Sequence, residues 1–252
     1  YLIDSALRLT EIFIEERAQF IMAASNYYTG FPALIAARRL GLPFFYEVRG
    51  FWEINRVSED PQFKYKDRYK QMVNMETYVA KNADHIFTLT KQMKNELINR
   101  GVHEKKITLL PNSCDPSRFY PRQPNQRLAN KLNIPSNIPV IGYVGSFVQY
   151  EGLEMLVKAA VKLKNKGFEF RLLIVGDERV SANNSPVISE EINRIARNNN
   201  IHDFLIMTGR VSHEEVEEYY SLIDITPFPR KSQLVTELVS PMKPLEALAM
   251  EK

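Results

Sequence analysis

Short apolar runs alternate along this chain with segments of helical periodicity, and the alternation restricts the fold more than any other feature. In the first half, the apolar runs occupy residues 20–24, 44–48, 86–89 and 107–110, and helical patterns lie near 31–39, 64–82 and 91–99. In the second half, the apolar runs occupy 140–144, 171–175, 204–207 and 223–226, and helical patterns lie near 151–166, 188–200, 212–222 and 241–250. Near-continuous apolar strands separated by helices are typical of parallel sheets covered on both faces. The sequence therefore predicts an α/β protein.

The alternation breaks once, over residues 111–138. This stretch is rich in proline and amide side chains and has little strand character. The 252 residues of the chain also exceed the ~100–200 residues of a typical domain. We therefore interpret the break as the junction between two α/β domains, residues 1–117 and 118–252.

Charge and cysteine content exclude several classes of protein. Lys and Arg number 33 and Asp and Glu number 30, a net charge of +3, without the clustered basic residues that mark nucleic-acid binding. The single cysteine, Cys114, cannot form an intramolecular disulfide and suits a cytoplasmic protein. The four histidines lack metal-ligand spacing, so we expect no metal site. No apolar run approaches the ~18–20 residues of a membrane span.

One stretch, residues 63–70, combines basic and aromatic side chains. Its simpler interpretation is the solvated start of a helix. Its functional interpretation is a contact with an anionic membrane surface or an acidic acceptor. A cytoplasmic location with a peripheral membrane contact therefore stays open.

Three glycines, Gly145, Gly176 and Gly209, each follow an apolar run in the second half. Ligands bind at the carboxyl ends of parallel strands, where backbone must come close to them. Each glycine alone is explained by a tight turn, but three in successive units favour a ligand cleft. The chain has neither a G-x-G-x-x-G nor a G-x-x-x-x-G-K-[ST] motif, which argues against a common dinucleotide-binding domain and a P-loop ATPase.

The segment 240–250 carries the most specific chemical signal. Serine is a favoured N-cap and proline a favoured first residue, so Ser240 and Pro241 predict a helix that begins near residue 241. Lys243 adds a positive charge in the first turn, where a phosphate would bind. Glu246 lies one turn further along, where a carboxylate accepts hydrogen bonds from sugar hydroxyls. The alternative is a capped amphipathic helix with a solvated lysine and glutamate.

Several ordered motifs resemble a known family. The segments 142–147, 173–177, 208–211, 224–230 and 241–247 are similar to the donor-binding domain of the retaining GT-B glycosyltransferases, also called glycosyl transferases group 1. In the first half, residues 41–53 resemble the acceptor-domain turn, and residues 83–90 and 110–113 resemble the segments that end that domain. The resemblance implies two Rossmann-like domains whose parallel sheets face each other across a cleft.

The resemblance also implies an activity. A hexosyltransferase of this kind moves a sugar from a nucleotide-diphosphate sugar to a hydroxyl of a saccharide or lipid-linked acceptor, as in polysaccharide biosynthesis. It implies retention of anomeric configuration, no metal ion and no cofactor besides the donor. Positioning of the reactants would supply most of the rate acceleration.

The same resemblance assigns residues. Donor binding falls to Gly145, Ser146, Gly209, Arg210, Val211, Pro241, Met242, Lys243 and Glu246. Within this set, Glu246 would hold the ribose and the backbone of residues 209–211 would lie against the base. The catalytic group is Arg49, Arg230 and Lys243, of which the last two would neutralise the leaving diphosphate.

Other interpretations of the assigned residues remain open. Arg49 has an interdomain ion pair as its alternative, and Arg210 and Arg230 have surface salt bridges. Glu53, placed on the acceptor side, would pair with acceptor hydroxyls or with Arg49.

The chain departs from the family pattern in three places. Family members usually carry an arginine and a lysine after the first donor-domain strand, and the matching positions here hold Ser146 and Glu151. The first of two glutamates seven residues apart is replaced by Leu238, and a histidine common in the acceptor domain corresponds to Arg49. Arg230 and Lys243 would supply the missing positive charge.

The family usually has a strand before Tyr1 and further elements after Lys252. We therefore expect a fragment shortened at both ends, with exposed apolar edges that make it unstable or self-associating. The alternatives to a transferase are a nucleotide-sugar epimerase of the same fold and a non-catalytic binding module or truncated gene product.

Overall fold

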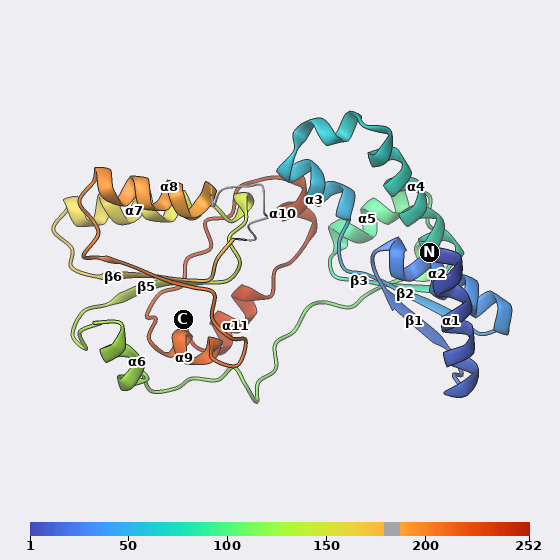
Figure 1. Cartoon of the computed structure of the whole chain (residues 1–252), viewed down its shortest axis with the longest axis horizontal. Helices are drawn as coiled ribbons and strands as arrows, with labels where there is room; N and C mark the ends of the chain where they lie inside the picture. The colour runs from blue at the N-terminus through green and yellow to red at the C-terminus, as the bar shows by residue number, and fades with distance from the viewer. Residues whose placement is uncertain (179–186) are drawn as a thin grey trace. The chain divides into compact units, whose positions relative to one another are not determined.

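The structure, a computed structural model, describes residues 1–178 and 187–252 and divides into two compact units (Figure 1). The first unit comprises Tyr1–Asn112 and Ser232–Ser240, and the second comprises Ser113–Lys231 and Pro241–Lys252. Each unit has its own parallel sheet with helices packed against it. The predicted α/β class with two parallel sheets is confirmed.

The sheet of the first unit has four parallel strands in the order β1-β2-β3-β4. Their bounds are Ile21–Ala24, Phe44–Val48, His85–Thr88 and Ile107–Leu109. The α-helices are α1 (Leu2–Glu15), α2 (Tyr27–Leu40), α3 (Trp52–Glu59), α4 (Asp67–Asn82), α5 (Lys91–Asn99) and α10 (Leu234–Leu238). Two 3-10 turns, η1 (Pro61–Tyr65) and η2 (Glu104–Lys106), complete the unit.

Local sequence explains why α2 begins and ends where it does. The side chain of Asn26 accepts a hydrogen bond from the Tyr28 N–H at 2.9 Å and so caps the first turn. At the other end Gly41 adopts φ 65°, the left-handed conformation in which glycine ends helices. Between these ends α2 buries small side chains, which lets it lie close to its neighbours.

Helix α10 comes from the C-terminal part of the chain but packs in the first unit, against α3 and α5. The Thr90 hydroxyl donates to the Leu238 carbonyl at 2.6 Å. The Asn112 side chain donates to the Ser240 carbonyl at 2.7 Å. The partners in each of these hydrogen bonds lie more than a hundred residues apart, so no local pattern reveals them. The sequence pattern therefore places residues 232–240 with the second domain, whereas the structure places them in the first unit.

In the described residues of the second unit, the sheet has three parallel strands in the order β5-β6-β7. Their bounds are Val140–Val144, Arg171–Val175 and Leu205–Gly209. The helices are α6 (Gln126–Lys131), α7 (Leu153–Asn165), α8 (Val187–Asn198), α9 (Val216–Ser221) and α11 (Lys243–Ala249), with one 3-10 turn, η3 (Gln149–Glu151).

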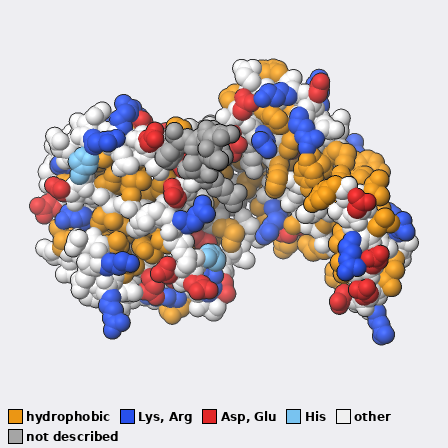
Figure 2. Space-filling model, in the orientation of Figure 1, with side chains coloured by type: hydrophobic (Ala, Val, Ile, Leu, Met, Phe, Trp, Pro, Cys, Tyr) orange, Lys and Arg blue, Asp and Glu red, His pale blue; other side chains and the backbone are white. Residues whose placement is uncertain are grey.

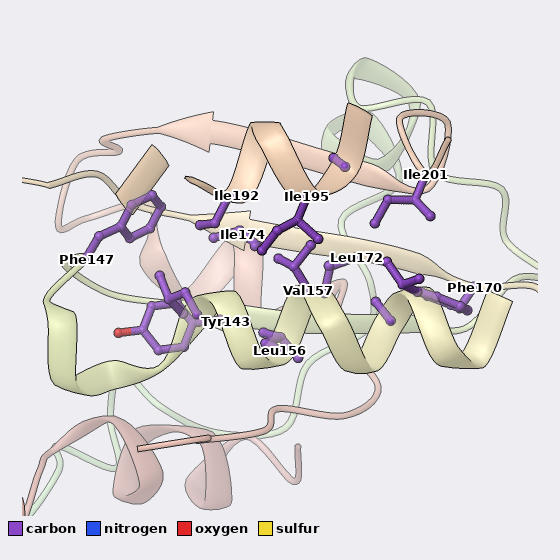
Figure 3. Close-up of a cluster of buried hydrophobic side chains, with 14 residues drawn as sticks. Tyr143, Phe147, Leu156, Val157, Phe170, Leu172, Ile174, Ile192, Ile195 and Ile201 are labelled. Carbon is purple, nitrogen blue, oxygen red and sulfur yellow. The ribbon is translucent and has the colours of Figure 1, made fainter. Parts of the chain in front are cut away.

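The central strand β6 is apolar on both faces because both faces are covered. Figure 3 shows Leu172 and Ile174 within a cluster that includes Val157 of α7 and Ile192 of α8. The alternate residues Leu173 and Val175 lie in a second cluster, with Tyr220, Ile223 and Met250. This two-sided burial is the arrangement that a continuous apolar run predicts.

One predicted strand is not formed, and one predicted helix begins two residues later than expected. Residues 223–226 form no full strand but only a single parallel bridge between Ile225 and Ile141, and the Ile225 side chain is 60% exposed. The helix expected from residue 241 begins at Lys243, and Met242 precedes it without a side-chain cap. The short helices α3, α6 and α10 lie outside the helical patterns predicted from the sequence.

Basic and acidic side chains are intermixed on the face shown in Figure 2. No helix in the described parts of the chain combines the length and the apolarity that crossing a bilayer requires.

Candidate functional site

Gly145, Gly176 and Gly209 of the second unit meet at the carboxyl ends of adjacent strands. The Gly145 N–H donates to the Val175 carbonyl at 2.9 Å, and the Gly176 N–H donates to the Gly209 carbonyl at 3.0 Å. A Cβ atom on Gly176 would lie 2.0 Å from the Gly145 carbonyl oxygen. Gly176 is therefore required by the neighbouring backbone, and the three strand ends form one closely packed edge.

The side chain of Lys243 lies directly over this edge. A Cβ atom on Gly145 would lie 2.2 Å from Lys243 Cε, and Gly145 has φ 151°, which side-chain-bearing residues rarely adopt. The ammonium group is 5.7 Å from the centre of the Tyr143 ring. Gly145 thus provides the space that the lysine occupies.

Lys243 and Arg230 converge on one carboxylate, that of Glu151. The Lys243 Nζ atom is 3.0 Å and the Arg230 Nε atom 3.7 Å from Glu151 Oε1. The glutamate side chain is 3% exposed, whereas the lysine and arginine side chains are 22% and 17% exposed. Two cations share one anion, so the group keeps a net positive charge, and the cation side chains are its more exposed members.

Burial shapes the chemistry around this group. Burial and the negative charge of Glu151 raise the pKa of the Tyr143 hydroxyl, which stays protonated and donates to the Ser146 carbonyl at 3.1 Å. Arg230 also lies over the Tyr150 ring, 5.6 Å from its centre. The two cations are therefore supported by aromatic faces as well as by the carboxylate.

Glu246 lies three residues after Lys243 on α11, so the two side chains share one side of the helix. In the described part of the chain no hydrogen bond or ion pair involves its half-buried carboxylate. Burial raises the pKa of Glu246, and the nearby His213 and Lys243 counteract this. An acceptor without a partner beside a cationic group is suited to bind hydroxyl groups.

The other predicted donor residues lie around the same strand ends. Ser146 and Arg210 are exposed and directly follow Gly145 and Gly209. Val211 packs against the second hydrophobic cluster. Met242 is 45% exposed just before α11, and Pro241 precedes it in the sequence.

In the first unit, Arg49 follows β2 with its side chain 57% exposed. Its Nε atom is 3.5 Å from Glu47 Oε1, and its N–H donates to the Ser25 hydroxyl oxygen at 3.0 Å. The arginine thus has an ion-pair partner in its own unit.

The structure corrects the assignment of Glu53. Its side chain is 2% exposed, and Oε1 lies 2.7 Å from Arg100 Nη1 rather than near Arg49. Arg100 also pairs with Glu96 at 2.8 Å and lies 4.1 Å from the centre of the Phe51 ring. Because its carboxylate is buried in this network, we assign Glu53 to the interior of the first unit instead of to acceptor binding.

Sequence reasoning noted Glu151 only as a departure from the family pattern. Its partner Lys243 lies 92 residues away, and no local pattern links the two. The sequence does contain one indication of the pair. Glu151 stands where the family usually has a basic residue, and the compensating positive charge is Lys243 in the helix near the C-terminus. Among residues 1–178 and 187–252, no group of three or more His, Cys, Asp or Glu side chains is placed to hold a metal ion.

Two family models match successive parts of the chain. Residues 2–113 match the glycosyl transferase 4-like domain, and residues 138–252 match glycosyl transferases group 1. The structure superimposes on the crystal structure of Anabaena Alr3699/HepE in complex with UDP with a TM-score of 0.77, at 13% identity, over 98% of this chain and 61% of that chain.

Curated relatives agree with these matches. The 2-deoxystreptamine glucosyltransferase of Streptomyces kanamyceticus is 24% identical over 200 residues, 77% of this chain and 49% of the relative. The capsular polysaccharide biosynthesis glycosyltransferase CapM of Staphylococcus aureus is 28% identical over 179 residues, 69% of this chain and 45% of the relative. The chain spans about half the length of these relatives. With two Rossmann-like units and both halves matched in order, the chain belongs to the glycosyltransferases of the GT-B fold, with a glycosyl transferase 4-like domain followed by a group 1 domain.

Proposed function

We propose that the protein transfers a sugar from a nucleotide-diphosphate sugar to a hydroxyl group of a saccharide or lipid-linked acceptor. The observation that carries the proposal is the pair of partly exposed cations, Lys243 and Arg230, beside the carboxylate of Glu246, which has no partner among the described residues. A diphosphate next to a ribose presents the two chemistries that these groups bind. The UDP complex of Alr3699/HepE and the capsular polysaccharide role of CapM are consistent with such a donor and acceptor.

In the proposed reaction, the bond between the sugar and the diphosphate breaks, and negative charge develops on the leaving oxygen. Lys243 and Arg230 would stabilise that charge, because both are positively charged and only partly exposed. Arginine adds a planar set of donors that matches phosphate oxygens. Helix α11 has only seven residues, so we attribute the anion binding to side chains rather than to its N-terminus.

Glu246 would accept hydrogen bonds from the ribose hydroxyls, and the backbone of residues 209–211 would lie against the base. Arg49 stays a candidate contact for the transferred sugar. We further propose retention of configuration without a metal ion, a cytoplasmic site of action, and a role in polysaccharide biosynthesis. The basic and aromatic stretch 63–70 is the candidate for a peripheral membrane contact.

Calorimetric titration with UDP, ADP and GDP tests the donor site. We expect at least one of the three to bind, and Lys243→Ala to weaken that binding about tenfold or more, because a charge-assisted contact contributes ~1.5–3 kcal/mol. The matched control is Lys158→Ala, which removes an exposed lysine from α7. Equal affinity of the wild type and Lys243→Ala would refute the assignment of the site.

Transfer is tested separately, by incubating the protein with nucleotide sugars and saccharide acceptors and analysing the products. A new glycoside with the anomeric configuration of the donor is the expected product. Conversion of one nucleotide sugar into another, without a glycoside, would instead identify an epimerase. Donor binding without any product would identify a binding module.

A further inference from the structure

Glu151 places a negative charge inside a site proposed to bind an anion. By Coulomb's law alone, a carboxylate at this position weakens diphosphate binding. The geometry around the residue gives a reason for its presence.

One oxygen of the carboxylate serves both cations, since Oε1 is 3.0 Å from Lys243 Nζ and 3.7 Å from Arg230 Nε. The other oxygen, Oε2, is buried and has no hydrogen-bond partner among the described residues. Glu151 is also far less exposed than either cation. The carboxylate is therefore the most deeply buried charge of the group, and the two cation side chains are the more accessible members.

The position of Glu151 is set by backbone contacts. The η3 turn that ends at Glu151 is tied to the chain next to Arg230, because the Lys231 N–H donates to the Tyr150 carbonyl at 2.8 Å. Gly152 follows with φ 72°, and a Cβ atom there would lie 2.1 Å from the Pro229 carbonyl oxygen. The turn that carries Glu151 is thus bound directly to the segment 229–231 that carries Arg230.

Flexible side chains lose entropy when a ligand immobilises them, at a cost of ~0.5–1.5 kcal/mol each. A buried anion that already holds Lys243 and Arg230 reduces that loss. The tight packing of the Lys243 stem over Gly145 restricts the lysine further.

We propose that Glu151 is a positioning residue that holds Lys243 and Arg230 in place for the donor diphosphate. The inference rests on the proposed function. On this proposal, Glu151 strengthens diphosphate binding, whereas Coulomb's law alone predicts that its negative charge weakens it.

The test is the affinity of Glu151→Gln for UDP and for inorganic pyrophosphate, measured by calorimetry. Glutamine keeps the shape and removes the charge. We expect about tenfold weaker binding of both ligands, because two side chains are released. Glu151→Asp, which restores the charge, is expected to recover most of the lost affinity. The matched control is Glu154→Gln, which removes a carboxylate three residues along that pairs with Lys231 at 2.6 Å.

The outcomes separate the two proposals. If the wild type binds and Glu151→Gln binds equally well or more tightly, the positioning role is wrong while the donor site stands. If Glu151→Asp is as weak as Glu151→Gln, or if Glu154→Gln is equally weak, the positioning role is also wrong. If the wild type binds neither UDP nor pyrophosphate, nor ADP or GDP, the proposed function fails and this inference fails with it. Thermal melting of each variant checks that the second unit is folded.

Discussion

The two units each bury a glutamate in an ion-pair network, but the networks have opposite arrangements. In the first unit, Arg100 is 8% exposed and pairs with both Glu53 and Glu96. In the second unit, Glu151 is the buried member and two partly exposed cations pair with it. The first network is closed to solvent around its cation, whereas the second presents its cations to solvent. Closed networks of this kind hold elements together, and open ones are available to ligands.

Breaking the closed network should have the largest effect. Arg100→Met leaves Glu53 buried without a cation, which costs ~3–5 kcal/mol of unfolding free energy. Chemical denaturation followed by circular dichroism measures this loss. The double variant Arg100→Met/Glu53→Gln should recover part of it, because no uncompensated charge remains. Equal unfolding free energies of the wild type and Arg100→Met would show that the network around Arg100 does not stabilise the first unit.

A third buried glutamate, Glu76, sharpens the comparison because no cation of the described residues forms an ion pair with it. Its carboxylate accepts from the Tyr46 hydroxyl at 2.7 Å and from the Tyr27 N–H at 2.8 Å, with Glu53 and Arg100 further away. Burial is the main cause that raises the pKa of Glu76, to about 7. The raised pKa means that the folded state binds the proton more tightly than the unfolded state.

The stability contributed by protonated Glu76 is therefore fully present below the unfolded pKa of about 4.5 and is lost as the pH rises through about 7. The contribution of Glu76 to the unfolding free energy changes by ~3 kcal/mol between those two pH values. We expect the unfolding free energy of the first unit to fall over this range in the wild type and to be flatter in Glu76→Gln. Denaturation curves at pH 4.5, 6 and 8 measure it, and parallel pH profiles for the two proteins would contradict it.

The open network is tested through Gly145. Gly145→Ala places a methyl group where the Lys243 side chain lies, so we expect about tenfold weaker UDP binding. Gly167→Ala is the matched control, because Gly167 also has a positive φ of 84° but no atom lies within 4 Å of its added Cβ. Both variants should lose some stability from backbone strain. Equal UDP affinity of the two variants would show that Lys243 does not depend on Gly145.

Glu246→Gln should have the smallest effect, a several-fold loss of UDP affinity with unchanged affinity for pyrophosphate. Glutamine keeps an acceptor and a similar shape, so a hydrogen bond to a charged group, ~1.5–3 kcal/mol, is replaced by one to a neutral group, ~0.5–1.5 kcal/mol. Calorimetry with both ligands measures the difference. A pH–rate profile that loses one limb, with donor affinity unchanged, would instead assign Glu246 to proton transfer.

Much of the fold is readable from the sequence because apolar runs and helical periodicity are local properties. The run 171–175 predicts β6, a strand with both faces covered, and its residues lie in two separate clusters. The run 223–226 shows the limit of such patterns, because it lies along the edge strand β5 and bonds to its Val140 and Gly142 but does not extend into a strand of its own. Here Ile225 makes one bridge to Ile141.

The site divides in the same way. Lys243 and Glu246 are recognisable from the sequence, because one helical turn contains both and their chemistry is local. The sequence also places Gly145, Gly176 and Gly209 at strand ends, and parallel pairing brings such ends to one edge. Only the tertiary structure decides that Glu151 holds Lys243 and Arg230, or that Glu53 pairs with Arg100 instead of Arg49. Ion-pair partners are chosen by proximity in space, and residues far apart in the chain leave no periodic pattern that records their contact.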